Sequence, residues 1–247
     1  MEYSMAMEIV AISDTHNKHK QIDLIHFQGA DVLIHAGDAT GRGQKGEIKK
    51  FLEWYGSIPA KLRIFVPGNH DIGFEERPGY YTRIAKEYGV TVLIDKELVW
   101  EGVKFYGMPW TPQFCDWAFN AQRDDMDFVV FKNGGIKTYP LIETFTDMIP
   151  DDTDVLISHG PCADILDSFP REYWHKPTNE VRHIDQSVGC EKLAERVREV
   201  KPDLHFFGHI HHSYGEKHLD GTSYYNCASL DEMYYFSNDP HRVSYEK

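Results

Sequence analysis

The chain has 247 residues, of which 41% are hydrophobic and 26% charged, and its 26 basic and 39 acidic side chains give a formal net charge of −13. This composition excludes a disordered chain, and the length is ample for a large core without disulfide bonds. The negative charge argues against stable binding of nucleic acids, because that needs Lys and Arg to displace counterions from phosphates. Its apolar runs are far shorter than the roughly 18 residues of a membrane span. No signal peptide is recognisable at the N-terminus. We therefore expect a cytoplasmic protein with no membrane partner.

Five predicted strands share one form, an apolar run that ends abruptly in small and polar residues. Continuous apolar runs of this kind are typical of strands that are buried on both faces of a sheet. The runs are Glu8–Ile12, Val32–Ile34, Ile64–Val66, Val155–Ile157 and Leu204–Phe207.

Helical periodicity lies between these runs. It covers Ile48–Tyr55, about Tyr80–Tyr88, and about Glu191–Val200. Two hairpins are also predicted, one over residues 98–106 and one over residues 216–227. Strands that alternate with helices favour an α/β layer arrangement, with two packed sheets and helices outside.

The chain shows no internal repeat, low-complexity tract or linker, so a single domain over residues 1–247 is the simplest organisation. Residues 109–139 are rich in aromatic side chains and resemble an insertion into the regular layers. Core packing and a substrate-binding wall near the active site are equally good interpretations of these aromatic residues.

The ends of the five strands carry the chemistry. The carboxyl ends of parallel strands are where open α/β sheets place their sites. Asp14 and His16 have the i, i+2 spacing that allows two side chains to hold one ion, and His209 and His211 repeat it. Carboxylate, imidazole and amide donors suit manganese, iron or zinc better than calcium or copper(I). The strand-end residues are Asp14, His16, Asp38, Asn69, His70, His159, His209 and His211. In contrast, His35 and His205 lie inside the apolar runs, and we expect them to be buried and hydrogen-bonded.

These residues belong to five short blocks that resemble, in order, the five motif blocks of the calcineurin-like metallophosphoesterases. The blocks are Asp14-Thr15-His16, Gly37-Asp38, Gly68-Asn69-His70-Asp71, Ser158-His159-Gly160 and Gly208-His209-Ile210-His211. Five further segments are similar to the small metallophosphoesterase-domain-containing phosphodiesterases. They are Pro109-Trp110, Phe114-Cys115, Trp117-Ala118-Phe119-Asn120, His159-Gly160-Pro161 and Val188-Gly189-Cys190-Glu191.

The resemblance implies a four-layer αββα sandwich of two mixed sheets flanked by helices, with two divalent metal ions per chain. We expect manganese first, with iron or zinc as alternatives. By motif, the first ion is held by Asp14, His16 and His211, and Asp38 bridges the two ions. The second ion is held by Asn69, His159 and His209. Some members of the smaller branch have glycine at the position of His209, so this chain is expected to have a complete second site.

Four residues are predicted to act on the substrate. His70 is assigned no metal and is the candidate general acid for the leaving alkoxide, with Asp71 as its orienting partner. Arg42 is a candidate phosphate contact, as is Asn69. Trp110 is a candidate for stacking on a nucleobase.

The leading interpretation is a dinuclear metal-dependent phosphodiesterase that hydrolyses a small phosphodiester, such as a cyclic nucleotide, with a metal-activated water. The alternatives are a phosphomonoesterase or phosphoprotein phosphatase, a nuclease, and a metal-loaded scaffold without activity. The residues from Gly37 to Gly43 depart from the usual protein-phosphatase pattern, and the retention of every ligand position argues against an idle scaffold. The sequence leaves the oligomeric state open.

Overall fold

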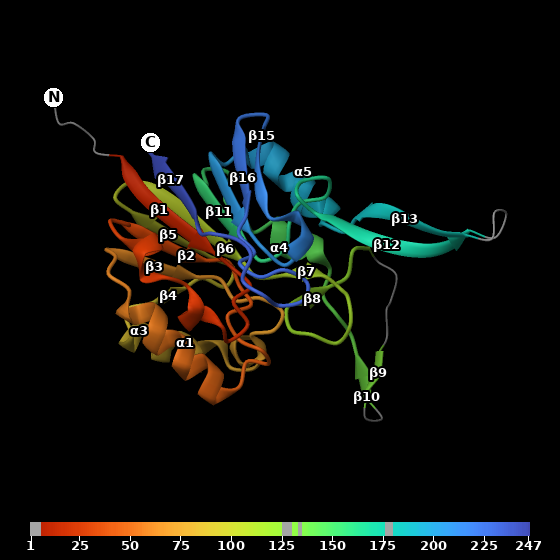
Figure 1. Ribbon diagram of the computed structural model, residues 1–247, viewed down its shortest axis with the longest axis horizontal. Helices are drawn as coiled ribbons and strands as arrows, with labels where there is room; N and C mark the ends of the chain where they lie inside the picture. Colours follow the sequence, from red (N-terminus) through yellow and green to blue (C-terminus); the bar gives the residue numbers. More distant parts are fainter. Residues whose placement is uncertain (1–5, 125–129, 133–134, 176–179) are drawn as a thin grey trace.

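The computed structural model describes residues 6–124, 130–132, 135–175 and 180–247 (Figure 1). Two large mixed sheets form its centre. The first has five strands in the order β17-β1-β2-β3-β4, in which β1 to β4 run parallel and β17 is antiparallel to β1. Its strands are β1 (Met7–Ile12), β2 (Val32–His35), β3 (Leu62–Phe65), β4 (Thr91–Val92) and β17 (His241–Tyr245).

The second sheet has six strands in the order β15-β16-β14-β11-β6-β5. Its four central strands are parallel, and an antiparallel hairpin closes each edge. Its strands are β5 (Lys96–Trp100), β6 (Val103–Met108), β11 (Val155–Ser158), β14 (Leu204–Phe207), β15 (Gly215–Leu219) and β16 (Thr222–Asn226).

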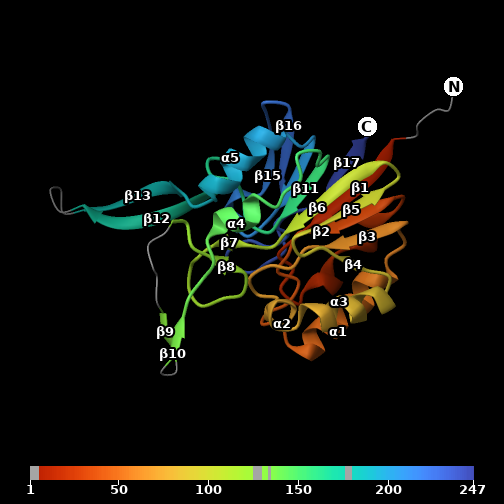
Figure 2. The ribbon, with the colours of Figure 1, turned by 180° about the vertical axis from the view of Figure 1, so that it is seen from behind.

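Helices cover the outer face of each sheet (Figures 1 and 2). The first and longest helix starts at a capping box, in which the Glu47 carboxylate accepts from the backbone N–H of Gln44 at 2.9 Å. The α-helices are α1 (Lys45–Ser57), α2 (Ile72–Glu76), α3 (Pro78–Glu87), α4 (Ile142–Thr146) and α5 (Glu191–Val200). Three short 3₁₀ helices cover His19–Gln21, Leu24–Phe27 and His211–Ser213. None of the helices in the described ranges is long and apolar enough to cross a membrane.

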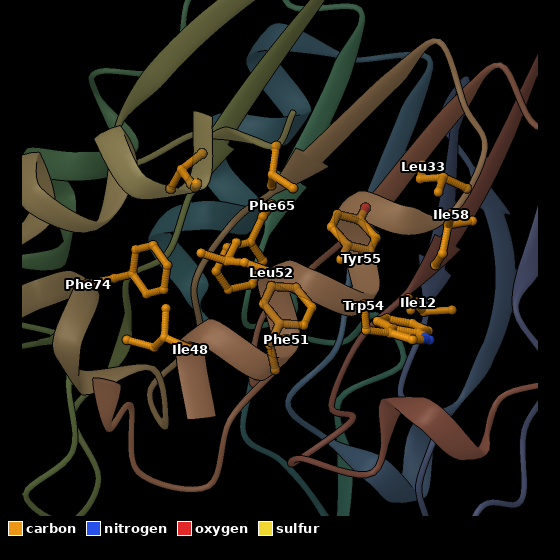
Figure 3. Close-up of a cluster of buried hydrophobic side chains, with 14 of the residues drawn as sticks. Ile12, Leu33, Ile48, Phe51, Leu52, Trp54, Tyr55, Ile58, Phe65 and Phe74 are labelled. Atoms are coloured by element: carbon orange, nitrogen blue, oxygen red, sulfur yellow. The ribbon is translucent and has the colours of Figure 1, made fainter. Parts of the chain in front are cut away.

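Three hydrophobic clusters separate four layers. The central one lies between the sheets and contains Ile9 and Ile34 from the first sheet and Phe105 from the second. Another lies under α1, where Phe51 and Tyr55 pack on the first sheet (Figure 3). The third lies between the second sheet and helices α4 and α5. The predicted αββα arrangement of two mixed sheets flanked by helices is confirmed, and the predicted strands and helices differ from the observed ones only by a few residues at their ends.

Three two-stranded sheets lie outside these layers. Two of them are hairpins that extend from the same side of the molecule (Figures 1 and 2). The pairs are β7 (Thr111–Pro112) with β8 (Asn120–Ala121), β9 (Val130–Lys132) with β10 (Gly135–Lys137), and β12 (Ser168–His175) with β13 (Glu180–Ser187). The expected insertion at residues 109–139 contains the first two pairs, although residues 125–129 and 133–134 lie outside the described ranges. The β12–β13 hairpin was not anticipated from the sequence.

Candidate metal centre

The ligand-type residues all follow strand ends, and both sheets contribute. The loop after β1 carries Asp14 and His16, the loop after β2 carries Asp38, and the loop after β3 carries Asn69. The second sheet supplies the others from the loops after β11 and β14. Because the parallel strands of each sheet run the same way, their carboxyl ends bring these loops to one edge of the sandwich.

The backbone of this edge is strained where the ligand-type side chains leave it. Asp14, His16, Asp38 and His209 have φ angles of 53°, 39°, 55° and 70°. Left-handed conformations of residues with a Cβ cost free energy and persist where the surrounding structure enforces them, commonly at functional sites. Close approach adds a second constraint, because a Cβ on Gly208 would overlap the carboxylate of Asp14.

The first ligand group consists of Asp14, His16 and His211, whose donor atoms all lie within 4.8 Å of one another. The Nε2 atom of His211 is 3.5 Å from Oδ1 of Asp14. Its other ring nitrogen, Nδ1, donates to the carbonyl oxygen of Asp231 at 3.0 Å. This bond leaves Nε2 of the neutral ring free to act as a ligand.

The second ligand group consists of Asp38, His159 and His209, again within 4.8 Å. His159 donates from Nδ1 to a backbone carbonyl at 2.9 Å, and its Nε2 lies 2.8 Å from Oδ1 of Asn69. The two oxygens of Asp38 lie 3.4 Å from His159 Nε2 and 3.7 Å from His16 Nε2. Asp38 therefore stands between the two groups, the position of the predicted bridging ligand.

When no cation is bound, protons on two histidines balance the charge of the carboxylates in this buried cluster. Burial lowers the pKa of His16 to about 4. Burial also lowers the pKa of His159, but the charge of Asp38 outweighs this effect and raises that pKa to about 9. Burial lowers the pKa of His211 as well, but the hydrogen bond to Asp14 outweighs it and raises that pKa to about 9. Two imidazolium rings thus sit beside two carboxylates, where bound cations would displace their protons.

The residues present fit two divalent cations. Both ring nitrogens of His16 and the Oδ1 atom of Asp14 are buried without a hydrogen-bond partner in the described structure. Leaving such atoms unpaired costs free energy, and a cation within reach of them removes that cost. The donor set of carboxylate, imidazole and amide oxygen matches the preferences of manganese, iron and zinc.

His35 and His205 lie behind the metal cluster and are fully buried in their strands, as expected. Nε2 of His35 is 3.0 Å from the Thr15 hydroxyl, and Nε2 of His205 is 2.7 Å from the Ser158 hydroxyl. Thr15 and Ser158 belong to the first and fourth motif blocks. The two histidines therefore anchor the loops that present the ligands.

His70 adjoins both ligand groups. Its Nδ1 donates to the Gly41 carbonyl oxygen at 2.8 Å, and its ring stacks on Trp117 with centroids 4.0 Å apart. Its Nε2 lies 4.0 Å from Oδ2 of Asp38, and the His70, His16 and Asp38 donor atoms also lie within 4.8 Å of one another. The geometry accommodates both a general acid and a metal ligand at this position.

The structure gives Asp71 a different position from the one expected. Its carboxylate is fully buried and accepts from the backbone N–H of Gly68 at 2.9 Å, and from the N–H and hydroxyl of Thr40 at 3.0 and 2.8 Å. The ring of His70 instead bonds to the Gly41 carbonyl oxygen. Asp71 thus ties the loops after β2 and β3 together, and the carbonyl has the orienting role.

The two predicted substrate contacts outside the ligand cluster also differ from expectation. Trp110 donates from Nε1 to Asp95 Oδ2 at 2.8 Å and stacks on Phe145 with centroids 3.8 Å apart, so its half-buried ring packs against protein neighbours. Arg42 is exposed, with its guanidinium 5.4 Å from the centre of the Trp117 ring. Neither side chain lines the cavity that opens onto the ligands.

This cavity has a volume of about 630 Å³ and is bordered by the ligand cluster on one side. Some of its lining residues were missed by sequence reasoning, because they lie outside the motif blocks. A weak signal existed for Tyr234, which begins the aromatic run Tyr234–Phe236. The missed residues include Arg123, Phe169, His212, Glu232 and Tyr234.

The two-sheet sandwich and its paired carboxylate and imidazole groups define a metal-dependent phosphoester hydrolase. The chain belongs to the calcineurin-like phosphoesterase family, whose sequence profile matches residues 7–213. This match confirms the predicted family. Members of this family bind a pair of divalent metal ions at such a site.

Individual relatives agree with this assignment. The chain is 34% identical over 253 residues to metallophosphoesterase domain-containing protein 1 of Homo sapiens, an alignment that covers 94% of this chain and 68% of that protein. It is 31% identical over 238 residues to UPF0046 protein K07C11.7 of Caenorhabditis elegans, covering 92% and 71% of the two chains. The crystal structure of TT1561 of Thermus thermophilus shares the fold, with a TM-score of 0.57 at 14% identity over 97% of this chain and 99% of that one.

Proposed function

We propose that this protein is a dinuclear metal-dependent phosphodiesterase that hydrolyses a small phosphodiester, of which a cyclic nucleotide is one example, with manganese as the preferred metal. The observation that carries the proposal is the convergence of ligand groups from both sheets beside one ligand-sized cavity. Asp14, His16 and His211 would hold one ion, and Asn69, His159 and His209 the other, with Asp38 between them.

Two cations held by these residues would supply an activated water nucleophile and positive charge for the phosphoryl oxygens. The lining of the cavity supports water as the nucleophile. Among its described residues it contains no Ser, Thr or Cys side chain, and its Asp38, His16, His209 and His211 side chains belong to the candidate ligand groups. Hydrolysis by direct attack of water is the mechanism that these residues support.

His70 would protonate the leaving alkoxide. Because Nδ1 donates to the Gly41 carbonyl oxygen, a neutral His70 ring has no proton on Nε2. The acid is therefore the imidazolium form, which gives its proton from Nε2. The stacked ring of Trp117 holds the imidazole in that orientation.

The size of the cavity favours a diester over a monoester. A diester has a second ester group that needs room beside the phosphorus, and about 630 Å³ provides it. A monoester dianion gains more from an additional cation. The single Lys or Arg in the described lining, Arg123, is paired with Glu191 and bonded to the carbonyls of Val188 and Gly189.

The test is an assay of phosphomonoesters, acyclic diesters and cyclic nucleotides with manganese, before and after chelation. We expect hydrolysis of diesters that is lost on chelation and restored by metal. Asp38→Asn should abolish it, whereas Asp152→Asn, which changes an exposed surface carboxylate, should not. Full turnover by the chelated protein would contradict the metal-dependent mechanism, and faster turnover of monoesters would establish the monoesterase alternative.

A further inference from the structure

Much of the cavity lining outside the candidate ligands is apolar. Such a lining beside a metal cluster provides a place for the organic part of a substrate. Its apolar side chains include Pro112, Phe114, Phe169, Val188, Ile210 and Tyr234.

Three of these residues have large aromatic rings that the protein leaves uncovered. Phe114 and Tyr234 are each 40% exposed, and Phe169 is 47% exposed. Two of these rings lie beside candidate ligands. The centroid of Phe114 is 5.1 Å from that of His209, and that of Tyr234 is 4.9 Å from that of His16. Uncovered aromatic rings at a site are surfaces on which flat apolar groups stack.

Phe169 comes from the β12–β13 hairpin, outside the motif blocks and the four layers. It lies near the start of β12, where its ring packs edge-on against His212, with centroids 5.7 Å apart. His212 directly follows the candidate ligand His211 in the sequence, and it contacts Phe169. The hairpin thus places an aromatic side chain in the wall of the cavity. Among the ring contacts of the described residues, Phe169 contacts His212 and no candidate metal ligand.

The charges of the lining restrict what this wall can accept. Outside the ligand cluster, the charged lining residues in the described structure are Arg123 and Glu232, apart from the titratable His212. Arg123 is paired as described above, and Glu232 Oε1 lies 2.5 Å from His212 Nδ1. A second phosphate or a carboxylate on the substrate would find no uncommitted Lys or Arg here, in a protein of net charge −13.

We infer that the cavity selects monoanionic phosphodiesters in which one ester group contains a flat, uncharged aromatic ring, and that Phe169 and Phe114 determine this specificity. The inference rests on the proposed function and names its substrate class. Aryl groups and nucleobases share the required chemistry. Substrates with alkyl groups alone, or with a second phosphate, are excluded from tight binding.

The experiment compares two monoanionic analogues, phenyl methylphosphonate and methyl methylphosphonate, by calorimetric titration into the manganese-loaded protein. We expect the phenyl analogue to bind at least about tenfold more tightly, because stacking on aromatic rings contributes on the order of a tenfold gain or more per ring. Phe169→Ala should reduce this preference about fivefold or more, whereas Phe169→Leu should reduce it less. Tyr235→Ala, at an exposed ring outside the cavity lining, is the matched control and should leave the preference unchanged.

Equal affinity of the unaltered protein for the two analogues would overturn the inference. If Phe169→Ala kept both the wild-type preference for the phenyl analogue and the wild-type manganese content, the role of Phe169 would be overturned. Turnover of bis(4-nitrophenyl) phosphate is measured in parallel. A phenyl preference without turnover of any diester would overturn the phosphodiesterase proposal and still support the aromatic cavity.

Discussion

The two possible roles of His70, general acid and metal ligand, differ in how strongly they depend on the leaving group. The hydrogen bond to Gly41 and the stack on Trp117 hold its ring from two directions, while Nε2 is directed toward Asp38 at 4.0 Å. A general acid at this position matters most when the leaving oxygen is a poor leaving group, such as a ribose alkoxide. It matters least for a nitrophenolate, which leaves readily without protonation.

His70→Ala should therefore keep both metal ions and lose about 10² to 10⁴ in rate on an alkyl or nucleotide ester, the usual contribution of general acid catalysis. The loss on a nitrophenyl ester should be much smaller. The measurements are kcat for both ester types and metal content per chain. Loss of a metal ion, or an equal loss of rate on both esters, would make His70 a ligand or a positioning residue instead.

Asp95 illustrates a buried charge whose pH dependence can be tested far from the ligands. Burial raises the pKa of its carboxyl to about 6, against the hydrogen bond from Trp110, and its Oδ1 atom has no hydrogen-bond partner in the described structure. A carboxyl whose pKa is higher in the folded protein stabilises the fold below its unfolded pKa. That stabilisation is lost as the pH rises through about 6.

Asp95→Asn should consequently raise the free energy of unfolding at pH 7.5, where the wild-type carboxylate is ionised. Asn also tolerates the φ angle of 50° at this position. From the two pKa values, the advantage should shrink by roughly 1.4 kcal/mol between pH 7.5 and pH 5. Urea denaturation of both proteins at both pH values measures the difference, and an advantage that is independent of pH would contradict the assigned cause.

Among the secondary-structure elements, the sequence was sufficient to predict the strands in which an apolar run ends in small or polar residues. The five buried strands and the blocks that follow them were predictable, because a fully apolar run followed by Gly, Asp or His has few other interpretations. The ligand residues came with them, since a loop at the end of a parallel strand reaches the same edge as its neighbours. Asp14 and His209, which lie 195 positions apart, are joined by a hydrogen bond of 2.9 Å for this reason.

Contacts between elements that are distant in sequence were not predictable in the same way. Trp110 was expected to face a substrate, but its partners are Asp95 and Phe145. The β12–β13 hairpin was missed because Phe169 and Arg171 share one face with Gln186 and Ile184, so no apolar face alternates along it. The wall of the cavity therefore depends on pairings for which the local sequence has no periodic signal.

Helix α1 allows a test of packing at a residue that is not itself a candidate metal ligand. Phe51 is fully buried, with its ring 4.8 Å from that of Phe65 and 5.3 Å from that of Tyr55. Phe51→Ala should lower the free energy of unfolding by about 3–5 kcal/mol through lost burial and the cavity left behind. Lys49→Ala, on the exposed face of the same helix, is the control and should change it by less than about 0.5 kcal/mol.

Chemical denaturation measures both α1 variants, and metal content is determined on the folded fraction. The ring of Phe51 also lies 5.0 Å from that of His35, which holds the loop of Asp14 and His16, so the metal content shows whether this loop keeps its position. A loss of less than about 1 kcal/mol would show that the cluster under α1 repacks around the missing ring.

Across the whole molecule, the candidate metal ligands come from both sheets. Asp14, His16 and Asp38 follow strands of the first sheet, whereas His159 and His211 follow strands of the second. The sheets also share the central hydrophobic cluster, which connects them independently of the ligands. Cations at the edge would add a second connection that exists only in the native arrangement, because the unfolded chain does not bring these loops together.

Ligands that bind the native state alone stabilise it by mass action. At a free metal concentration of 100 times Kd, the expected gain is about 2.7 kcal/mol per site. Chelation should therefore lower Tm, and Tm should rise again with the concentration of added manganese. Calcium, which prefers an all-oxygen set of ligands, should restore much less of the loss than manganese does.

Asp38→Asn provides the decisive control for this connection, because Asp38 lies between the two ligand groups. Without the second carboxylate oxygen both ions should bind weakly, so the Tm of this variant should depend little on manganese. His209→Ala removes a residue of one group only and should retain part of the dependence. Scanning calorimetry of the three proteins over a range of metal concentrations measures these slopes. If the Tm of the unaltered protein were independent of manganese while the metals were shown to bind, the cluster would not stabilise the native arrangement of the two sheets.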